Sequence, residues 1–76
     1  MENIEQKLLL IWQEIIHTNV VDPQQNLLDQ GGNSLHFIKL ASVVSKAFSI
    51  TISPSDIFTA GNLSALAKII QQRQVA

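Results

Sequence analysis

The sequence predicts an all-α protein, a bundle in which three longer helices and one short helix surround an aliphatic core. Three observations predict this fold. Apolar residues recur at the spacing of an amphipathic helix in three separate stretches. Serine, asparagine, proline and glycine stand where helices begin and end. The one alternating stretch, residues 50–52, is short and has no candidate strand to pair with, so we expect an extended linker there.

The first helix is predicted over about residues 2–17. Its apolar stripe consists of residues at helical spacing: Ile4, Leu8, Ile11, Trp12, Ile15 and Ile16. Leu10 falls on the polar side, and we expect it to be exposed. Residues 19–30 then form a long connection, broken by Pro23. We expect four apolar side chains to pin this loop to the helices: Val20, Val21, Leu27 and Leu28.

The second helix is predicted over residues 34–48, with these residues on its core face: Phe37, Leu40, Ala41, Val44, Ala47 and Phe48. Ser53, Pro54 and Asp56 are typical of a helix start, and the short helix that follows should hold Ile57 and Phe58. Gly61 ends it. Asn62 then caps a last helix to about Arg73, with an apolar face of Leu63, Leu66, Ala67, Ile69 and Ile70.

Length and composition argue against several classes of function. Seventy-six residues make one domain, residues 1–76, with little room for an enclosed catalytic cavity, so we do not expect an enzyme. A net charge of −1 and 14% charged residues argue against nucleic-acid binding. The absence of cysteine suits a reducing cytoplasm, and the N-terminal apolar run is interrupted by polar residues, unlike a signal peptide or a membrane span. We therefore expect a soluble, monomeric protein, either free-standing or one module of a longer chain.

The most informative motif runs from Gly31 through Gly32, Asn33 and Ser34 to Leu35. The glycines free the backbone, Asn33 is a preferred N-cap, and Ser34 takes the first helical position. Unpaired amides and the helix dipole would stabilise a phosphate ester on its hydroxyl. Taken alone, however, the motif is also typical of an ordinary helix start.

A second set of residues on the same helix flanks the direction in which the Ser34 side chain is expected to point. Four of them are candidates for partner binding: Leu35, Ile38, Lys39 and Ser42. We expect Leu35 to be exposed, whereas Ile38 could equally turn inward against the last helix.

Ser34 lacks the companions of a catalytic serine. A nucleophile needs a base within hydrogen-bond reach, and His36 lies roughly 160° around the helix. We expect His36 and His17 to be exposed polar residues. The carboxylates are scattered, with no spacing that suggests a metal site.

The whole pattern resembles the acyl and peptidyl carrier proteins of fatty-acid, polyketide and nonribosomal peptide synthesis. The resemblance is carried by residues 26–35 (NLLDQGGNSL), 47–53 (AFSITIS), 56–58 (DIF) and 62–67 (NLSALA). It implies a four-helix carrier bundle in which a phosphopantetheinyl transferase attaches 4′-phosphopantetheine of coenzyme A to Ser34. The thiol of that arm would hold an acyl or aminoacyl group as a thioester. Implied partners are an adenylation or other acyl-loading enzyme and condensation, tailoring or thioesterase enzymes.

Departures from the acidic carriers of fatty-acid synthesis favour the peptidyl subclass. Asn33 stands where aspartate is usual, and uncharged or basic residues occupy positions that are often acidic on the second helix: Lys39, Ser42, Ser45 and Lys46. Gln30 replaces a more usual leucine, and Leu27 and Leu28 replace an aromatic pair. The alternatives are an acyl carrier of polyketide or fatty-acid type, an unmodified interaction module of the same fold and, more remotely, a small serine hydrolase. The loaded group is left open.

Overall fold

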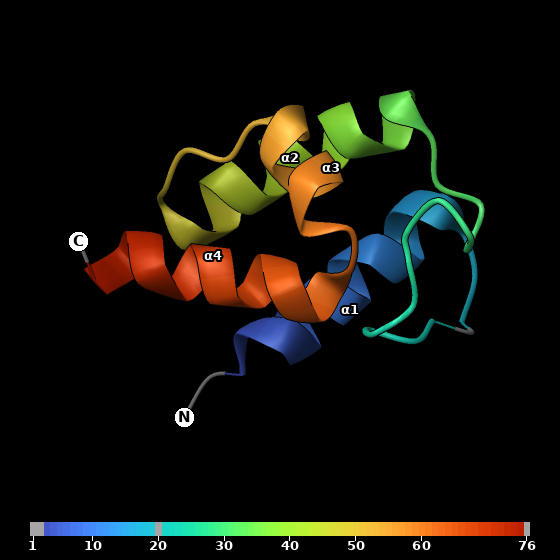
Figure 1. Cartoon of the computed structure of the whole chain (residues 1–76), viewed down its shortest axis with the longest axis horizontal. Helices are drawn as coiled ribbons and strands as arrows, with labels where there is room; N and C mark the ends of the chain where they lie inside the picture. The colour runs from blue at the N-terminus through green and yellow to red at the C-terminus, as the bar shows by residue number, and fades with distance from the viewer. Residues whose placement is uncertain (1–2, 20, 76) are drawn as a thin grey trace.

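Four helices make up the regular structure of the chain: α1 (Ile4–Ile16), α2 (Ser34–Phe48), α3 (Pro54–Ala60) and α4 (Leu63–Val75) (Figure 1). The structure, a computed structural model, describes residues 3–19 and 21–75, and over these ranges it contains no strand. The all-α fold with one short helix is therefore confirmed. The expected contact of Val20 lies outside the described residues. The first helix, expected over about residues 2–17, is shorter, because the extended Asn3 is its N-cap and the left-handed His17 its C-cap.

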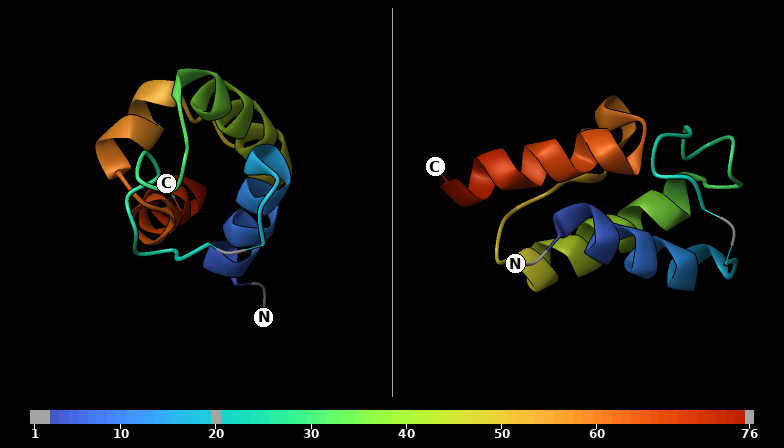
Figure 2. Two further views of the ribbon diagram at one scale, coloured as in Figure 1. Left: turned by 90° about the vertical axis from the view of Figure 1, so that its right-hand side faces the viewer. Right: turned by 90° about the horizontal axis from the view of Figure 1, so that it is seen from below.

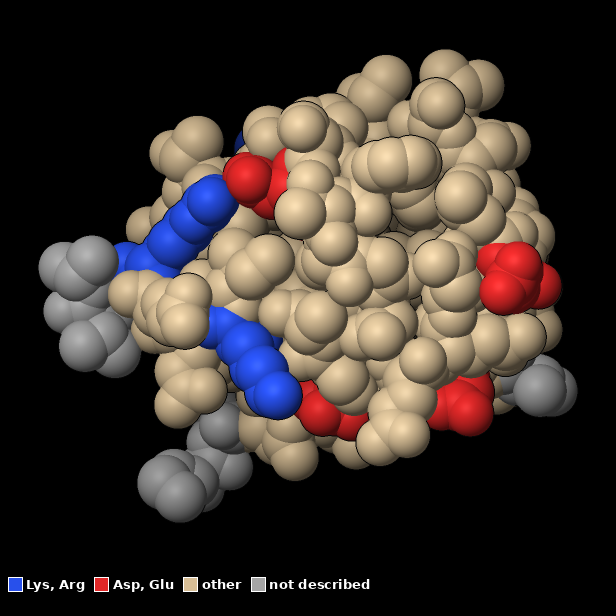
Figure 3. Space-filling view, viewed as in Figure 1, with Lys and Arg blue, Asp and Glu red and all other residues tan. Residues whose placement is uncertain are grey.

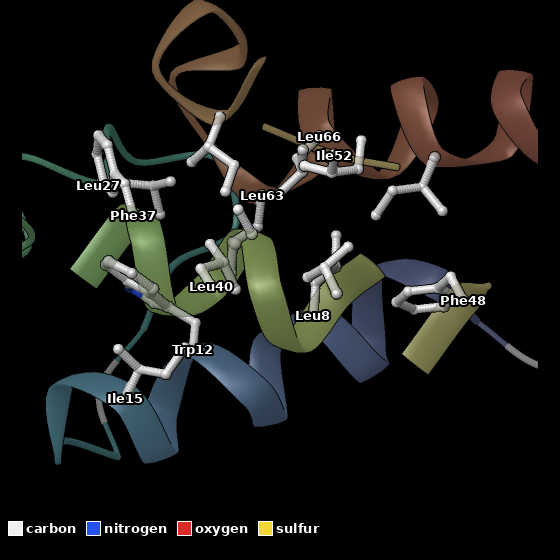
Figure 4. Packing of buried hydrophobic residues seen from close by; sticks show 14 residues of the cluster. Leu8, Trp12, Ile15, Leu27, Phe37, Leu40, Phe48, Ile52, Leu63 and Leu66 are labelled. Atoms are coloured by element: carbon white, nitrogen blue, oxygen red, sulfur yellow. The ribbon is translucent and has the colours of Figure 1, made fainter. Parts of the chain in front are cut away.

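The helices surround a shared apolar core. α1 packs against α2 and α4, while α3 bridges α2 and α4, and the end-on view in Figure 2 shows the four arranged in a ring. Every helix contributes buried residues, among which Trp12 is the largest that is fully enclosed. The core also takes one residue from the long loop and one from the linker, Leu27 and Ile52 (Figure 4).

Capping side chains fix the helix starts, and those of α3 and α4 are the ones that the sequence predicts. Asn3 caps α1, Asn62 Oδ1 accepts the Ala65 amide at 2.7 Å, and Ser53 with Asp56 forms a reciprocal capping box on α3. α4 continues to Val75 rather than ending near Arg73. The described helices include none that is both long enough and apolar enough to cross a bilayer.

The long loop between α1 and α2 is tied to the junction of α3 and α4. The Leu27 amide donates to the Gly61 carbonyl at 2.9 Å, and the Ser64 amide donates to the Pro23 carbonyl at 3.0 Å. Leu27 is fully buried and Val21 packs partly on the core, as expected. Leu28 was expected to pin the loop but is 48% exposed, because Leu27 already fills the inward position.

Two side chains of α2 and α3 are exposed where the sequence suggested otherwise, and the linker between these helices is held by a serine. Ala47 is exposed, not buried as expected: it lies within about 20° of the buried Leu40 around α2, but two turns further on, where the neighbouring helices no longer cover this side. Phe58 lies on α3 as predicted but points outward. The 50–52 segment is an extended linker, and Ser45 Oγ holds it by accepting from the Ile52 amide at 3.0 Å and donating to the Ile52 carbonyl at 3.2 Å.

Candidate functional site

Ser34 is the first residue of α2 and is exposed to solvent. Asn33, in extended conformation, caps the helix with its side-chain oxygen, which accepts the His36 amide at 3.1 Å. Amides of a first helical turn have no intrahelical acceptor, so this end of α2 favours negative charge. Within the described part of the chain, the Ser34 hydroxyl makes no hydrogen bond to another residue. The hydroxyl is thus available for reaction.

The two glycines before Ser34 serve different purposes. Gly31 has φ +93°, a conformation that side chains disfavour, while a Cβ there would meet nothing within 4 Å. Gly32 lies against the core: a Cβ would stand 2.7 Å from the Leu27 carbonyl oxygen and 2.8 Å from the Trp12 ring. Its amide donates to that same carbonyl at 3.0 Å. Gly31 therefore provides the turn, and Gly32 lets the loop lie directly on Trp12.

Gln30 stabilises the same loop, a role that the sequence did not reveal. Its side-chain amide donates to the carbonyls of Asp22 and Gln25, each at 2.9 Å. The leucine that is more usual at this position could make neither bond. The only indication of this role in the sequence was that Gln30 replaces the leucine that is more usual in the family.

His36 is not the exposed polar residue that we expected. It is half-buried, and its Nδ1 accepts the Asn33 amide at 3.2 Å, which completes a reciprocal capping box. The imidazole also meets the Trp12 indole edge-on, with ring centroids 6.1 Å apart. The prediction failed because it considered only the angle to Ser34 and not the helix cap. His17, by contrast, is exposed as expected, in the left-handed conformation that ends α1.

An apolar patch flanks Ser34, made by Leu35 (75% exposed), Ile38 (55%) and Phe58 (65%). The alternative in which Ile38 turns inward is therefore wrong. A groove of about 350 Å³ between α2 and α3 joins Ser34 to Ile38 and Phe58, and Pro54 and Ser55 complete its α3 side. Phe58 belongs to the surface although sequence reasoning placed it only on the short helix. Lys39 and Ser42 are exposed, as predicted.

Charge is sparse around the molecule. The face in Figure 3 is mostly uncharged, with basic side chains confined to its left side, toward the end of α4. There Arg73 pairs with Asp56 at 2.8 Å. This hydrogen bond, together with bonds from the backbone and hydroxyl of Ser53, holds the pKa of Asp56 well below its ordinary value of 3.8. Among the described residues no group of histidine and carboxylate side chains could hold a metal ion.

The described residues thus form a four-helix bundle with an exposed serine hydroxyl, unbonded to any other described residue, at the start of α2. Residues 6–70 match the family described as the phosphopantetheine attachment site. The chain belongs to this family, whose members are modified covalently with 4′-phosphopantetheine. Carrier domains of this kind are not themselves catalytic.

Similar curated proteins are large synthetases. The chain is 32% identical over 72 residues to gramicidin S synthase 2 of Aneurinibacillus migulanus, and 29% identical over 68 residues to one of the plipastatin synthase subunits of Bacillus subtilis. These matches cover 95% and 90% of this chain but only 2% and 3% of those proteins. The chain thus spans a small part of the length of the relatives it matches.

Two solved structures share the fold. One is NpsA-ThdA of Klebsiella oxytoca, an artificially fused adenylation–PCP didomain of a nonribosomal peptide synthetase. It is 66% identical, with a TM-score of 0.84 over 93% of this chain and 14% of that chain. The other is BlmI, a type-II acyl carrier protein of Streptomyces verticillus. It is 22% identical, with a TM-score of 0.86 over 91% of this chain and 83% of that chain, and this likeness concerns the fold alone.

Proposed function

We propose that Ser34 is the attachment point of 4′-phosphopantetheine and that residues 1–76 form a single carrier domain. The observation that carries this proposal is the exposed Ser34 hydroxyl, unbonded to other described residues, at the capped start of α2. Gly31, Gly32 and Asn33 shape the site by setting the turn, the loop position and the cap. The group, once attached, supplies a thiol that carries an acyl or aminoacyl unit as a thioester.

The attachment requires only an accessible acceptor from this chain. The Ser34 oxygen forms a bond to the phosphorus on the pantetheine side of coenzyme A. The pyrophosphate bond breaks, adenosine 3′,5′-bisphosphate leaves, and the hydroxyl proton passes to a base on the transferase. His36 cannot be that base in the described geometry, because its Nδ1 is occupied by the Asn33 amide. The occupied Nδ1 of His36 supports the proposal that the chain is not itself an enzyme and is modified by a phosphopantetheinyl transferase.

We place the carrier in nonribosomal peptide synthesis or related secondary metabolism. The 66% identity to a structure that contains a PCP supports this subclass, as do the relatives among peptide synthetases. An acyl carrier of polyketide or fatty-acid type is the second candidate. The corresponding partners are an adenylation or other loading enzyme and condensation, tailoring or thioesterase enzymes, met by a monomer in the cytoplasm.

The partner surface is the exposed part of α2 next to Ser34, where Leu35, Ile38, Lys39 and Ser42 lie, extended by Phe58 on α3. Exposed aliphatic and aromatic side chains with a polar rim suit a transient interface. Because the surface carries few charges, shape and apolar contact outweigh electrostatic steering in the choice of partner.

The decisive experiment is incubation with coenzyme A and a broad-range phosphopantetheinyl transferase, followed by intact-mass measurement. The wild-type chain should gain one phosphopantetheine, and Ser34→Ala should gain none. Ser55→Ala is the matched control, since Ser55 is another exposed serine on the same groove. It should be modified like the wild type. A wild-type mass that stays unchanged would refute the assignment.

The same samples separate the alternatives. An unmodified interaction module would bind its partner equally well as wild type and as Ser34→Ala. A serine hydrolase would be labelled at Ser34 by a phosphonate probe, which we do not expect because no described side chain is hydrogen-bonded to the hydroxyl.

A further inference from the structure

Two hydrogen bonds connect His36 to Asn33, the residue that precedes Ser34. The Asn33 amide donates to His36 Nδ1 at 3.2 Å, and the His36 amide donates to Asn33 Oδ1 at 3.1 Å. Ser34 lies between these two bonds in the sequence. The reciprocal pair therefore restrains the backbone on either side of the serine.

Only the neutral imidazole can make this contact. Nδ1 accepts a hydrogen bond when the ring proton is on Nε2, whereas both nitrogens of the imidazolium are donors. A cation in the first turn of α2 would also face the positive end of the helix dipole. Protonation of His36 therefore removes the bond from Asn33 and leaves half of the capping box.

The ring is held in place from the other side by α1. Its partner there is the Trp12 indole, on which Gly32 also lies. Four other titratable side chains belong to this end of the bundle: Glu14 and His17 of α1, Asp29 of the loop and Lys39 of α2. All four are exposed, and within the described residues none is hydrogen-bonded or ion-paired to His36. Protonation of the ring therefore affects the cap through one contact, the hydrogen bond from the Asn33 amide to His36 Nδ1.

We propose that His36 is a positioning residue for the modification of Ser34, acting as a neutral imidazole through Asn33. The proposal rests on the assignment of Ser34 as the attachment point. Histidine changes its charge between about pH 5 and 8. When the ring is protonated, the bond from the Asn33 amide is lost, Ser34 samples more conformations, and its modification by a given transferase slows.

The first test compares modification rates of the wild type, His36→Gln and His36→Ala with one transferase between about pH 5.5 and 8. Glutamine at this helix position keeps a capping acceptor that does not titrate. The alanine variant should be slower than the wild type at the upper pH by about fivefold, the equivalent of one capping bond. The glutamine variant should recover most of that loss.

The ratio of wild-type to His36→Gln rates is the deciding quantity, because the pH dependence of the transferase cancels from it. We expect this ratio to fall by about fivefold toward the lower pH. A ratio that stays constant across the range would overturn the proposal.

The second test needs no modification and separates this proposal from the first. In ¹⁵N NMR spectra of the unmodified protein, the Asn33 amide should shift as His36 is protonated, and it should stay fixed in His36→Gln. If every variant remains unmodified at all pH values, the assignment of Ser34 fails while the Asn33 signal still tests the cap. An Asn33 amide that ignores the protonation of His36 would contradict the proposal independently.

Discussion

Trp12 holds the loop before Ser34 and the start of α2 in one place. Its indole is fully buried, lies under Gly32, and contacts the His36 ring edge-on and the Phe37 ring at a tilt. The site therefore depends on one large side chain of α1, seen in Figure 4 between α1 and α2. Small residues around it are constrained because a close-packed interior leaves no space for added atoms.

Replacement of Gly32 by alanine should destabilise the protein by about 1–3 kcal/mol, the usual cost of overpacking. The new methyl group would stand 2.8 Å from the Trp12 ring and 2.7 Å from the Leu27 carbonyl oxygen. Urea titration measures the loss of stability, and the shifted Trp12 fluorescence reports the displaced indole.

Gly31→Ala is the matched control. It adds the same methyl group into open space, so its cost comes only from the positive φ, and the emission of Trp12 should be unchanged. Identical fluorescence changes in both variants would show that Gly32 does not touch the ring as described.

At the scale of helices, the stability of α3 comes mainly from contacts at its start, because the helix is short. It has seven residues, too few to be stable alone. Ser53 and Asp56 form its capping box, and Arg73 of α4 donates both to Asp56 at 2.8 Å and to the Thr51 carbonyl at 2.7 Å. One arginine thus links α4 to α3 and to the linker before it.

The lowered pKa of Asp56 makes this contact sensitive to acid. Because its pKa is lower in the folded than in the unfolded chain, the stabilisation is complete above the ordinary value of 3.8 and is lost as the pH falls below it. In urea titrations between about pH 5 and 3, Asp56→Asn should lose less stability than the wild type.

Arg73→Gln separates the ion pair from the capping box. It should weaken the acid dependence without abolishing it, and salt should reduce the effect because both side chains are partly exposed. Equal acid dependence in the wild type and Asp56→Asn would contradict the role of this carboxylate.

The sequence predicted the helices because each is defined locally, by apolar spacing and by caps such as Asn33 and Ser53. It also pointed to Ser34, whose position follows from the adjacent glycines and cap. It could not predict the roles of Gln30 or His36, since polar side chains make such bonds only after tertiary contacts have placed the backbone. Phe58 was missed for a related reason: exposure on a short helix depends on the angle at which α3 meets α2.

At the scale of the whole molecule, Ser34 shares one groove with Ile38 and Phe58, two of the three residues of the apolar patch, while Leu35 is exposed next to Ser34 in α2. The patch combines α2 and α3, which lie next to each other at the top of Figure 1. A partner that covers it also reaches the start of α2. The relative placement of the two helices is thus part of the proposed partner surface.

Charge substitutions should separate this surface from the core. Leu35→Asp or Ile38→Asp should weaken binding of a loading enzyme by about tenfold or more, as expected for central apolar contacts, while changing the free energy of unfolding by less than about 0.5 kcal/mol. Leu40→Asp should unfold the bundle, because it places a carboxylate where the native side chain is 0% exposed. Binding by calorimetry and thermal melts distinguish the two effects.

Leu10→Asp is the matched control for the surface variants. Leu10 is 55% exposed, like Ile38, but it lies on α1 away from the groove. It should leave both binding and stability near the wild-type values. If it weakens binding as much as Ile38→Asp does, the partner does not dock where we place it.

The start of α1 and the end of α4 lie on the same side of the molecule, and α2 begins on the far side in both lateral views (Figures 1 and 2). A purification tag, a surface anchor or a fused enzyme joined at either end would therefore be attached on the side of the molecule opposite to Ser34. The protein could be immobilised on a sensor chip or fused to another enzyme through either end, and Ser34 would remain exposed to solvent.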